Sequence, residues 1–286
     1  MNAMQMITPT ELARHHRAVL AGVLWAAAAS GAVAGEVNLL EQRVQVSLGT
    51  FTNASRLDIR VDGEAGETGT TVDWDDTFGD QDETRGRLDA LWRIADRHYF
   101  RVMYTDYSRS RTRTIEDEIV WQGDVIPVDA DATGRFGFEI FEAAYEYAVV
   151  KSQDFELTGS VGLHYTKLEA SLTAEVEAGG EQGMVDRGGR AAVNAPLPVI
   201  GARTLWRFHE NLYLDFMGQA FYLSIDDFDG TILNARAAVT WQPKALLGLG
   251  FGYDWFRVDV DVDRSSFDGS MDWTYSGPQV FFNLSF

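Results

Sequence analysis

The feature that most constrains this 286-residue chain is an alternation of apolar and polar side chains at period two, which continues to its last residue. One face of the final segment carries Val280, Phe282, Leu284 and Phe286. The opposite face carries Gln279, Asn283 and Ser285. Such alternation is typical of a β-strand whose two faces meet different environments. A soluble sandwich would leave a terminal Phe on its apolar face exposed to water, whereas a bilayer would solvate it with lipid.

Nine earlier segments show the same period. The predicted strands are 43–61, 85–95, 99–113, 136–150, 155–177, 199–208, 212–228, 231–241, 247–262 and 271–286. In the segment that begins at Leu247, for example, Phe251 and Tyr253 alternate with Gly250 and Gly252. A soluble sandwich would alternate as well, with its apolar face on a core, so alternation alone does not separate the two folds.

The connections between these segments alternate in length. Short polar turns are predicted at 96–98, 151–154, 209–211 and 242–244. Longer, acidic and Gly-rich connections are predicted at 62–84, 114–135, 178–198 and 263–270, with a tight turn at 226–230. Because lipid offers no hydrogen bonds, spanning strands satisfy their backbone groups only in a closed ring. We therefore predict an all-β fold, a transmembrane antiparallel up-and-down β-barrel of about ten strands. Eight or twelve strands are the alternatives, because 52–55 could form a bend or a turn.

The last strand, closed by Phe286, resembles the C-terminal signal of bacterial outer-membrane β-barrel proteins. The resemblance covers the remaining strands as a pattern and identifies no subfamily. It implies location in the outer membrane of a Gram-negative-type cell, with outer-membrane lipids and lipopolysaccharide as partners. It also implies that the barrel assembly machinery recognises Val280, Phe282, Leu284 and Phe286 as an insertion signal.

Residues 1–34 have the pattern of an export signal. Arg14 and Arg17 precede an uncharged apolar stretch over 18–29, and Ala32-Val33-Ala34 supplies a small-x-small cleavage site. We therefore predict a signal peptide over 1–34 and a barrel domain over 35–286. The formal net charge of −19 argues against nucleic acid as a partner, because phosphate binding requires basic surfaces.

The inward faces of the predicted strands carry charges of both signs. The predicted lumen residues are Arg87, Arg93, Arg101, Glu142, Glu146, Arg203, Arg207, Asp215 and Arg236, together with Asp89, Glu156 and Asp254. Buried ions need partners or water, so two interpretations follow. The charges either form a plug of salt bridges or a constriction that selects small solutes by charge. We favour the plug, because side chains normally fill small barrels.

The predicted loops are strongly acidic. Their aspartates form three groups: Asp73, Asp75, Asp76, Asp80 and Asp82; Asp226, Asp227 and Asp229; and Asp259, Asp261 and Asp263. Divalent cations bind oxygen ligands and could bridge such groups, but the spacing matches no EF-hand loop. We favour a solvated acidic rim and assign no metal site. Arg109, Arg111 and Arg113 share one face and could bind lipopolysaccharide phosphates or pair with acidic residues at 116–118; we favour the pairing.

An enzyme finds little support in the sequence. His164 shares an inward face with Ser160 and Glu156, but Ser160 lies four residues away on the same strand, roughly 13 Å at ~3.3–3.4 Å per residue. That separation excludes a nucleophilic triad. His98 and His209 lie at predicted short turns, whereas an omptin-like Asp/His protease would need a histidine beside the outer carboxylates.

We therefore expect a non-enzymatic barrel without a cofactor. It would be structural or a narrow, porin-like channel for small solutes, with acidic extracellular loops. One alternative is a barrel that acts through its loops in adhesion or in cation-dependent lipopolysaccharide binding. Another is a barrel hydrolase.

Overall fold

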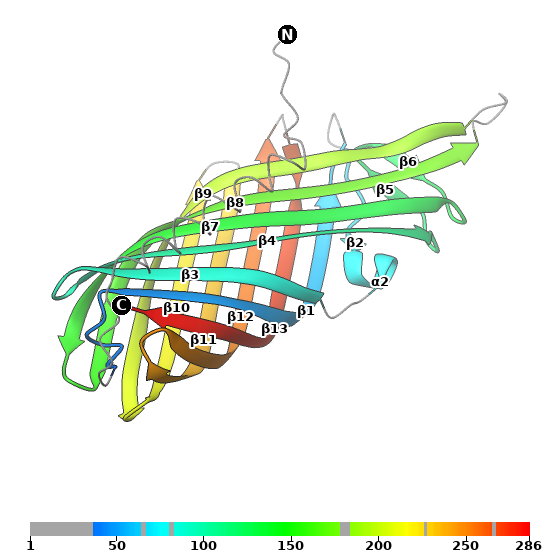
Figure 1. Ribbon diagram of the computed structural model, residues 1–286. Helices are drawn as coiled ribbons and strands as arrows, with labels where there is room; N and C mark the ends of the chain where they lie inside the picture. Colours follow the sequence, from blue (N-terminus) through cyan, green and yellow to red (C-terminus); the bar gives the residue numbers. More distant parts are fainter. Residues whose placement is uncertain (1–36, 64–66, 80–82, 178–183, 226–227, 265–266) are drawn as a thin grey trace, which may run out of the picture.

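The chain forms a closed antiparallel β-barrel (Figure 1). The computed structural model describes residues 37–63, 67–79, 83–177, 184–225, 228–264 and 267–286. Within these residues, ten long strands follow one another around the ring in chain order, and β13 pairs with β1 to close it. The strands are β1 (Val44–Val61), β3 (Glu83–Ala95), β4 (His98–Thr114), β7 (Asp131–Lys151), β8 (Phe155–Glu177), β9 (Met184–His209), β10 (Leu212–Ile225), β11 (Phe228–Lys244), β12 (Leu247–Arg264) and β13 (Phe267–Ser285). This arrangement confirms the predicted all-β up-and-down barrel of about ten strands.

The two ends of the barrel differ. At the inner end, the backbones of Val44 and Phe286 exchange hydrogen bonds of 2.7 and 2.9 Å. The tight connections β3–β4, β7–β8, β9–β10 and β11–β12 lie at this end, at the four short turns that the sequence predicts. The long connections β1–β3 and β4–β7 lie at the opposite, outer end, where β10–β11 and β12–β13 are separated by only two residues each, so the predicted connection at 263–270 is mostly strand. The predicted export signal, 1–34, falls outside the described residues.

Short elements occupy the outer end, where the sequence predicted only loops at 62–84 and 114–135. They are β2 (Val72–Asp73), α2 (Trp74–Phe78), β5 (Ile119–Trp121) and β6 (Asp124–Ile126). Asp73 caps α2 by accepting the backbone N–H groups of Asp75 and Asp76. The β5–β6 hairpin turns through Gln122 and Gly123, whose φ values of 54° and 81° suit a two-residue hairpin loop.

The outer halves of several strands extend beyond their predicted limits. The largest difference is in β9, which begins at Met184, whereas 178–198 was predicted as a connection. Pro196 and Pro198 lie within the strand and pair with β8. On its other side β9 pairs with β10 only as far as Ile200, and no described strand forms a ladder with that edge over 184–199. Proline is tolerated in a strand with a free edge, so the two prolines, which are typical of a loop, did not mark a connection here.

An apolar belt surrounds the outside of the barrel nearer the inner end. Each of the ten strands contributes at least one large, exposed apolar side chain: Leu48, Trp92, Phe100, Phe141, Leu163, Ile200, Phe216, Leu233, Phe251 and Phe282. A continuous belt of this kind is unfavourable in water and is solvated by hydrocarbon in a membrane. Beyond the belt the outer surface carries exposed ion pairs, such as Arg190–Glu169 and Arg257–Asp272. No helix among the described residues has the length and apolarity to cross a membrane.

Candidate functional site

The centre of the lumen holds a network of buried ion pairs around Glu146. Arg101 on β4 donates from Nε to Glu146 Oε1 at 2.7 Å and from Nη2 to Glu142 Oε1 at 2.6 Å. Arg203 on β9 donates from Nε to the other oxygen of Glu146 at 3.0 Å and lies 3.4 Å from Asp215 Oδ2. Glu146 therefore links two arginines from different walls of the barrel.

Further polar side chains extend this network around the ring. Gln219 on β10 donates to Glu142 at 2.7 Å and accepts a hydrogen bond from Asn234 on β11 at 3.1 Å. His164 Nε2 lies 3.2 Å from the free oxygen of Glu142, and both side chains are fully buried. Tyr99 donates to Glu156 on the same side of the lumen.

A second group of charges connects the remaining walls. Arg87 on β3 donates to Asp89 at 2.8 Å and to Asp254 on β12 at 2.9 Å. Arg236 on β11 lies 3.8 Å from Asp89 and 5.0 Å from the ring of Phe281. The two groups together place paired charges on strands from β3 around to β12.

Two of the predicted lumen residues lie nearer the inner end than the rest. Arg207 pairs with Asp154 of the β7–β8 turn at 2.6 Å, and Arg93 donates to the carbonyl of Leu40. The other ten lie in the two groups of paired charges described above: Arg87, Asp89, Arg101, Glu142, Glu146, Glu156, Arg203, Asp215, Arg236 and Asp254.

The segment before β1 narrows the inner end of the lumen. Leu39 and Leu40 are buried, and the hydroxyl of buried Tyr213 donates to the carbonyl of Val37 at 2.8 Å. Between this segment and the central network lies a polar cavity of about 80 Å³. Leu39, Asp89, Arg101, Arg203 and Arg236 are among the residues that line it.

Aromatic rings cross the lumen on the outer side of the network. Trp273 on β13 contacts Phe138 on β7, with ring centroids 4.3 Å apart, although the two strands belong to different walls. Phe256 and Tyr275 stack at 5.0 Å beside Trp273. The guanidinium of Arg85 lies 4.0 Å from the ring of Tyr107, a distance suited to a cation–π contact. We call Trp273, Phe138, Phe256, Tyr275 and their ring neighbours the aromatic layer.

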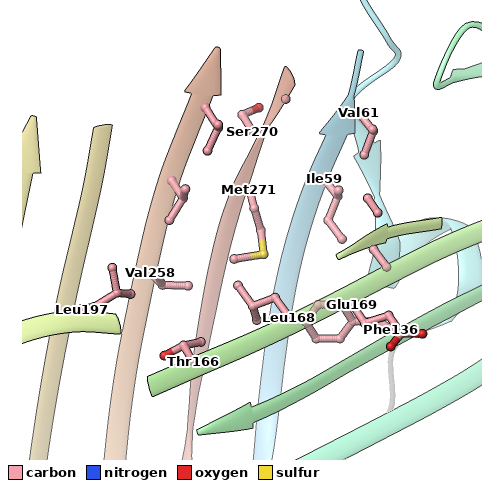
Figure 2. Close-up of a pocket in the computed structure, with 15 residues that line it drawn as sticks. Ile59, Val61, Phe136, Thr166, Leu168, Glu169, Leu197, Val258, Ser270 and Met271 are labelled. Carbon is pink, nitrogen blue, oxygen red and sulfur yellow. The ribbon is translucent and has the colours of Figure 1, made fainter. Parts of the chain in front are cut away.

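Apolar side chains continue from the aromatic layer to the outer end. Trp74 and Phe78 of α2 are buried and their rings contact each other. Trp74 also contacts the ring of Trp121 on β5. Gly134 on β7 permits this packing, because a Cβ atom there would stand 2.6 Å from the ring of Phe78. An apolar pocket remains between β1, β12 and β13 on one side and β7, β8 and β9 on the other (Figure 2).

The sequence did not predict this apolar half of the lumen. The inward positions of Phe136, Leu172 and Val258 were available in the alternation, but the predicted plug was based on the charged inward residues alone. The useful signal is that the inward residues of β7, β8 and β12 change from polar to apolar toward the outer end.

The aspartates of the three predicted acidic groups are not all exposed to solvent, as a solvated rim would require. Asp75 is buried; it accepts the backbone N–H of Leu57 at 2.8 Å and pairs with Arg109 at 2.8 Å. Arg109 therefore pairs with Asp75 and not with the acidic residues at 116–118. Among the described residues, no group of three or more acidic or histidine side chains could hold a metal ion. Asp80, Asp82, Asp226 and Asp227 fall outside the described residues.

Three aspartates form a row on the outer surface, beyond the belt. Asp58 on β1 is in register with Asp272 on β13, which is in register with Asp259 on β12. Partial burial raises the pKa of Asp58, and the negative charge of Asp73 raises it further. Partial burial and the negative charge of Asp272 raise the pKa of Asp259 in the same way. Charge on these two carboxyl groups therefore opposes folding at neutral pH.

A pH dependence follows from this row. A carboxyl group with a raised pKa in the folded state favours unfolding when ionised, so stability should increase as pH falls from neutral through the raised pKa toward about 4. Asp259→Asn should raise the melting temperature at pH 7 and reduce the gain on acidification. Thermal melts of both proteins in detergent at pH 7 and pH 5 measure this. A variant less stable than the wild type at pH 7 would contradict the assignment.

The histidines lie away from the outer carboxylates. His164 is in the central network, and His98, at the start of β4, contacts Tyr145 Oη at 2.6 Å near the inner end. His209 ends β9 at a short turn. In the described part of the chain, the outer end therefore offers no Asp–His pair.

Comparison with solved structures identifies the fold. The crystal structure of the outer membrane protease OmpT from Escherichia coli aligns with a TM-score of 0.57 and 9% identity, over 88% of this chain and 99% of that chain. The translocator domain of the autotransporter NalP from Neisseria meningitidis aligns less well, with a TM-score of 0.42 and 13% identity, over 93% of this chain and 96% of that chain. No family model and no curated protein matches the sequence. At this identity the likeness to OmpT concerns the fold alone. The chain has the fold of a bacterial outer-membrane β-barrel, and its apolar belt is suited to contact with the hydrocarbon of a membrane.

Proposed function

We propose that this protein is a non-enzymatic, structural outer-membrane barrel whose lumen is closed to ions. The observation that carries the proposal is the contact between Trp273 and Phe138, made across the lumen by strands of different walls. Water and hydrated ions cannot pass through closely packed aromatic rings.

The ion-pair network supports the same conclusion. A selective constriction would leave charges with water as their main partner, so that a passing ion could replace it. Here Glu142 and Glu146 are fully buried and bonded to arginine or amide groups of the protein. Such mutual pairing suits a plug that joins the walls.

The absence of enzymatic activity is part of the proposal. The outer surface beyond the belt carries carboxylates, but the described histidines lie in the central network or near the inner end. The side chains of His164 and Glu142 are each fully buried, and this limits access for a polymeric substrate.

We also propose that the last strand directs insertion of the barrel into the membrane. Val280 and Phe282 are exposed on the lipid side of β13, and Leu284 and Phe286 are half-buried beside them. This arrangement supports recognition of the last strand by the barrel assembly machinery, and lipids of the outer membrane would then cover the belt.

Single-channel recording tests the closed lumen. The refolded protein in a planar bilayer should show no discrete conductance steps, because two layers of side chains close the lumen. Its insertion is verified by heat-modifiable gel migration of protein recovered from vesicles made in parallel. Regular steps from inserted protein, which change in size in an Arg203→Gln variant, would establish a charge-selective channel in place of a plug.

A further inference from the structure

The polar cavity between the segment before β1 and the central network has features that a structural role does not require. Its volume is about 80 Å³, roughly half of the 150 Å³ that encloses benzene in an engineered protein cavity. It therefore admits only a molecule with few non-hydrogen atoms. Apolar side chains such as Leu39, Met217 and Phe281 form part of its wall, and charged and polar side chains form the rest.

Arg236 presents a guanidinium group to this cavity without a hydrogen bond to any described residue. The nearest carboxylate oxygen, on Asp89, is 3.8 Å away, and Nε is buried without a partner. The side chain is 10% exposed, and its two Nη groups remain accessible from the cavity. The other arginines of the wall, Arg101 and Arg203, already bond to Glu146. Because a guanidinium fork matches carboxylate oxygens, Arg236 is suited to a ligand carboxylate.

Asp215 presents an incompletely paired carboxylate on the neighbouring strand, β10. Its side chain is 21% exposed, and its one hydrogen bond, from Arg203 Nη1, is long at 3.4 Å. Asp215 is in register with Ala238, and Arg236 is in register with Met217, so the two charged residues are diagonal neighbours. Diagonal positions lie about 7–8 Å apart. One small molecule can therefore contact both side chains in the same cavity.

The charges around the cavity favour a ligand that carries both signs. The group around Glu146 contains four carboxylates, two arginines and His164, whereas the group around Asp89 contains two aspartates and two arginines. A lone anion would meet the surplus carboxylates of the first group, and a lone cation would meet the three arginines of the wall. A zwitterion offers a carboxylate to Arg236 and an ammonium group to Asp215, so both of its charges gain a counter-ion.

We propose that this cavity binds a small zwitterion, a free α-amino acid of the size of glycine or alanine. Arg236 would donate from its Nη groups to the ligand carboxylate, and Asp215 would accept from the ligand ammonium group. The volume of the cavity excludes longer side chains. The site lies on the inner side of the central network, so binding does not depend on whether the aromatic layer closes the lumen.

The test uses the full-length protein, refolded in detergent and checked by heat-modifiable gel migration. Equilibrium dialysis with radiolabelled glycine measures binding, with unlabelled acetate, methylamine, leucine and glycine as competitors. We expect saturable glycine binding and competition at least about tenfold weaker from the other three, because each lacks one charged contact or does not fit. Acetate or methylamine that competes as well as glycine would overturn the proposal, as would leucine that does so or the absence of saturable binding.

Substitutions in the cavity test the two contacts separately. Arg236→Gln and Asp215→Asn should each weaken glycine binding by about tenfold or more. The control is Arg207→Gln, which removes a lumen arginine that pairs with Asp154 outside the cavity wall and should change binding less than about twofold. Ala238→Leu fills the cavity, keeps every charge, and decides the question if an anchor variant fails the migration check. Wild-type affinity in any folded cavity variant, or an equal loss in Arg207→Gln, would contradict the assignment.

Discussion

Trp273→Ala is expected to lower the free energy of unfolding by about 3–5 kcal/mol, the range for truncating a large buried aromatic side chain. The indole of Trp273 is fully buried and contacts Phe136, Phe138, Phe256 and Tyr275. Its removal leaves a cavity in the middle of the aromatic layer, and strands of a closed ring have little freedom to collapse into it. Urea unfolding in detergent, followed by gel migration, measures the loss.

A tryptophan of the belt provides the matched control. Trp241 is 50% exposed on the outer face of β11, and truncation there leaves a space that lipid or detergent can fill. Trp241→Ala should therefore cost clearly less than Trp273→Ala. Equal losses would show that the aromatic layer is no better packed than the outer surface.

Glu146→Gln is expected to destabilise the barrel by about 3–5 kcal/mol, because removing one partner of a buried ion pair leaves the other charge uncompensated. Here the change affects two cations at once, since Arg101 and Arg203 each bond to one oxygen of Glu146. The same unfolding measurement applies.

Glu169→Gln is the control for charge removal. Glu169 also pairs with an arginine, Arg190, but the pair is exposed on the outside of the barrel. Exposed pairs contribute about 0–1 kcal/mol, so this variant should remain close to the wild type. If both substitutions had the same small effect, the central network would not hold the walls together.

Much of the fold could be predicted from local pattern. The period-two alternation located ten strands, and the four short turns set their antiparallel order, because both features depend on nearby residues. The limits of β9 could not be predicted in this way. Pro196 and Pro198 indicate a loop unless the strand has a free edge, and that edge exists only because β10 stops pairing at Ile200.

For the candidate site as well, the sequence predicted which residues face the lumen but not how they pair. The sequence placed Arg101, Glu142 and Arg203 on inward faces, but their pairing through Glu146 depends on register between strands far apart in the chain. Asp75 appeared to be one of several solvated aspartates. Its burial against Arg109 follows from α2 packing into the outer end of the barrel, which no local pattern indicates.

The amino-acid sequence alone determined which face of each strand is apolar and how the strands follow one another, because side-chain alternation and turn length are local properties of a strand. The tertiary structure decided what fills the lumen. Trp273 and Phe138 lie 135 residues apart in the chain, and only closure of the ring brings their aromatic rings into contact across it. The polar cavity beside Arg236 has the same origin, since its walls belong to strands that meet only when the barrel closes.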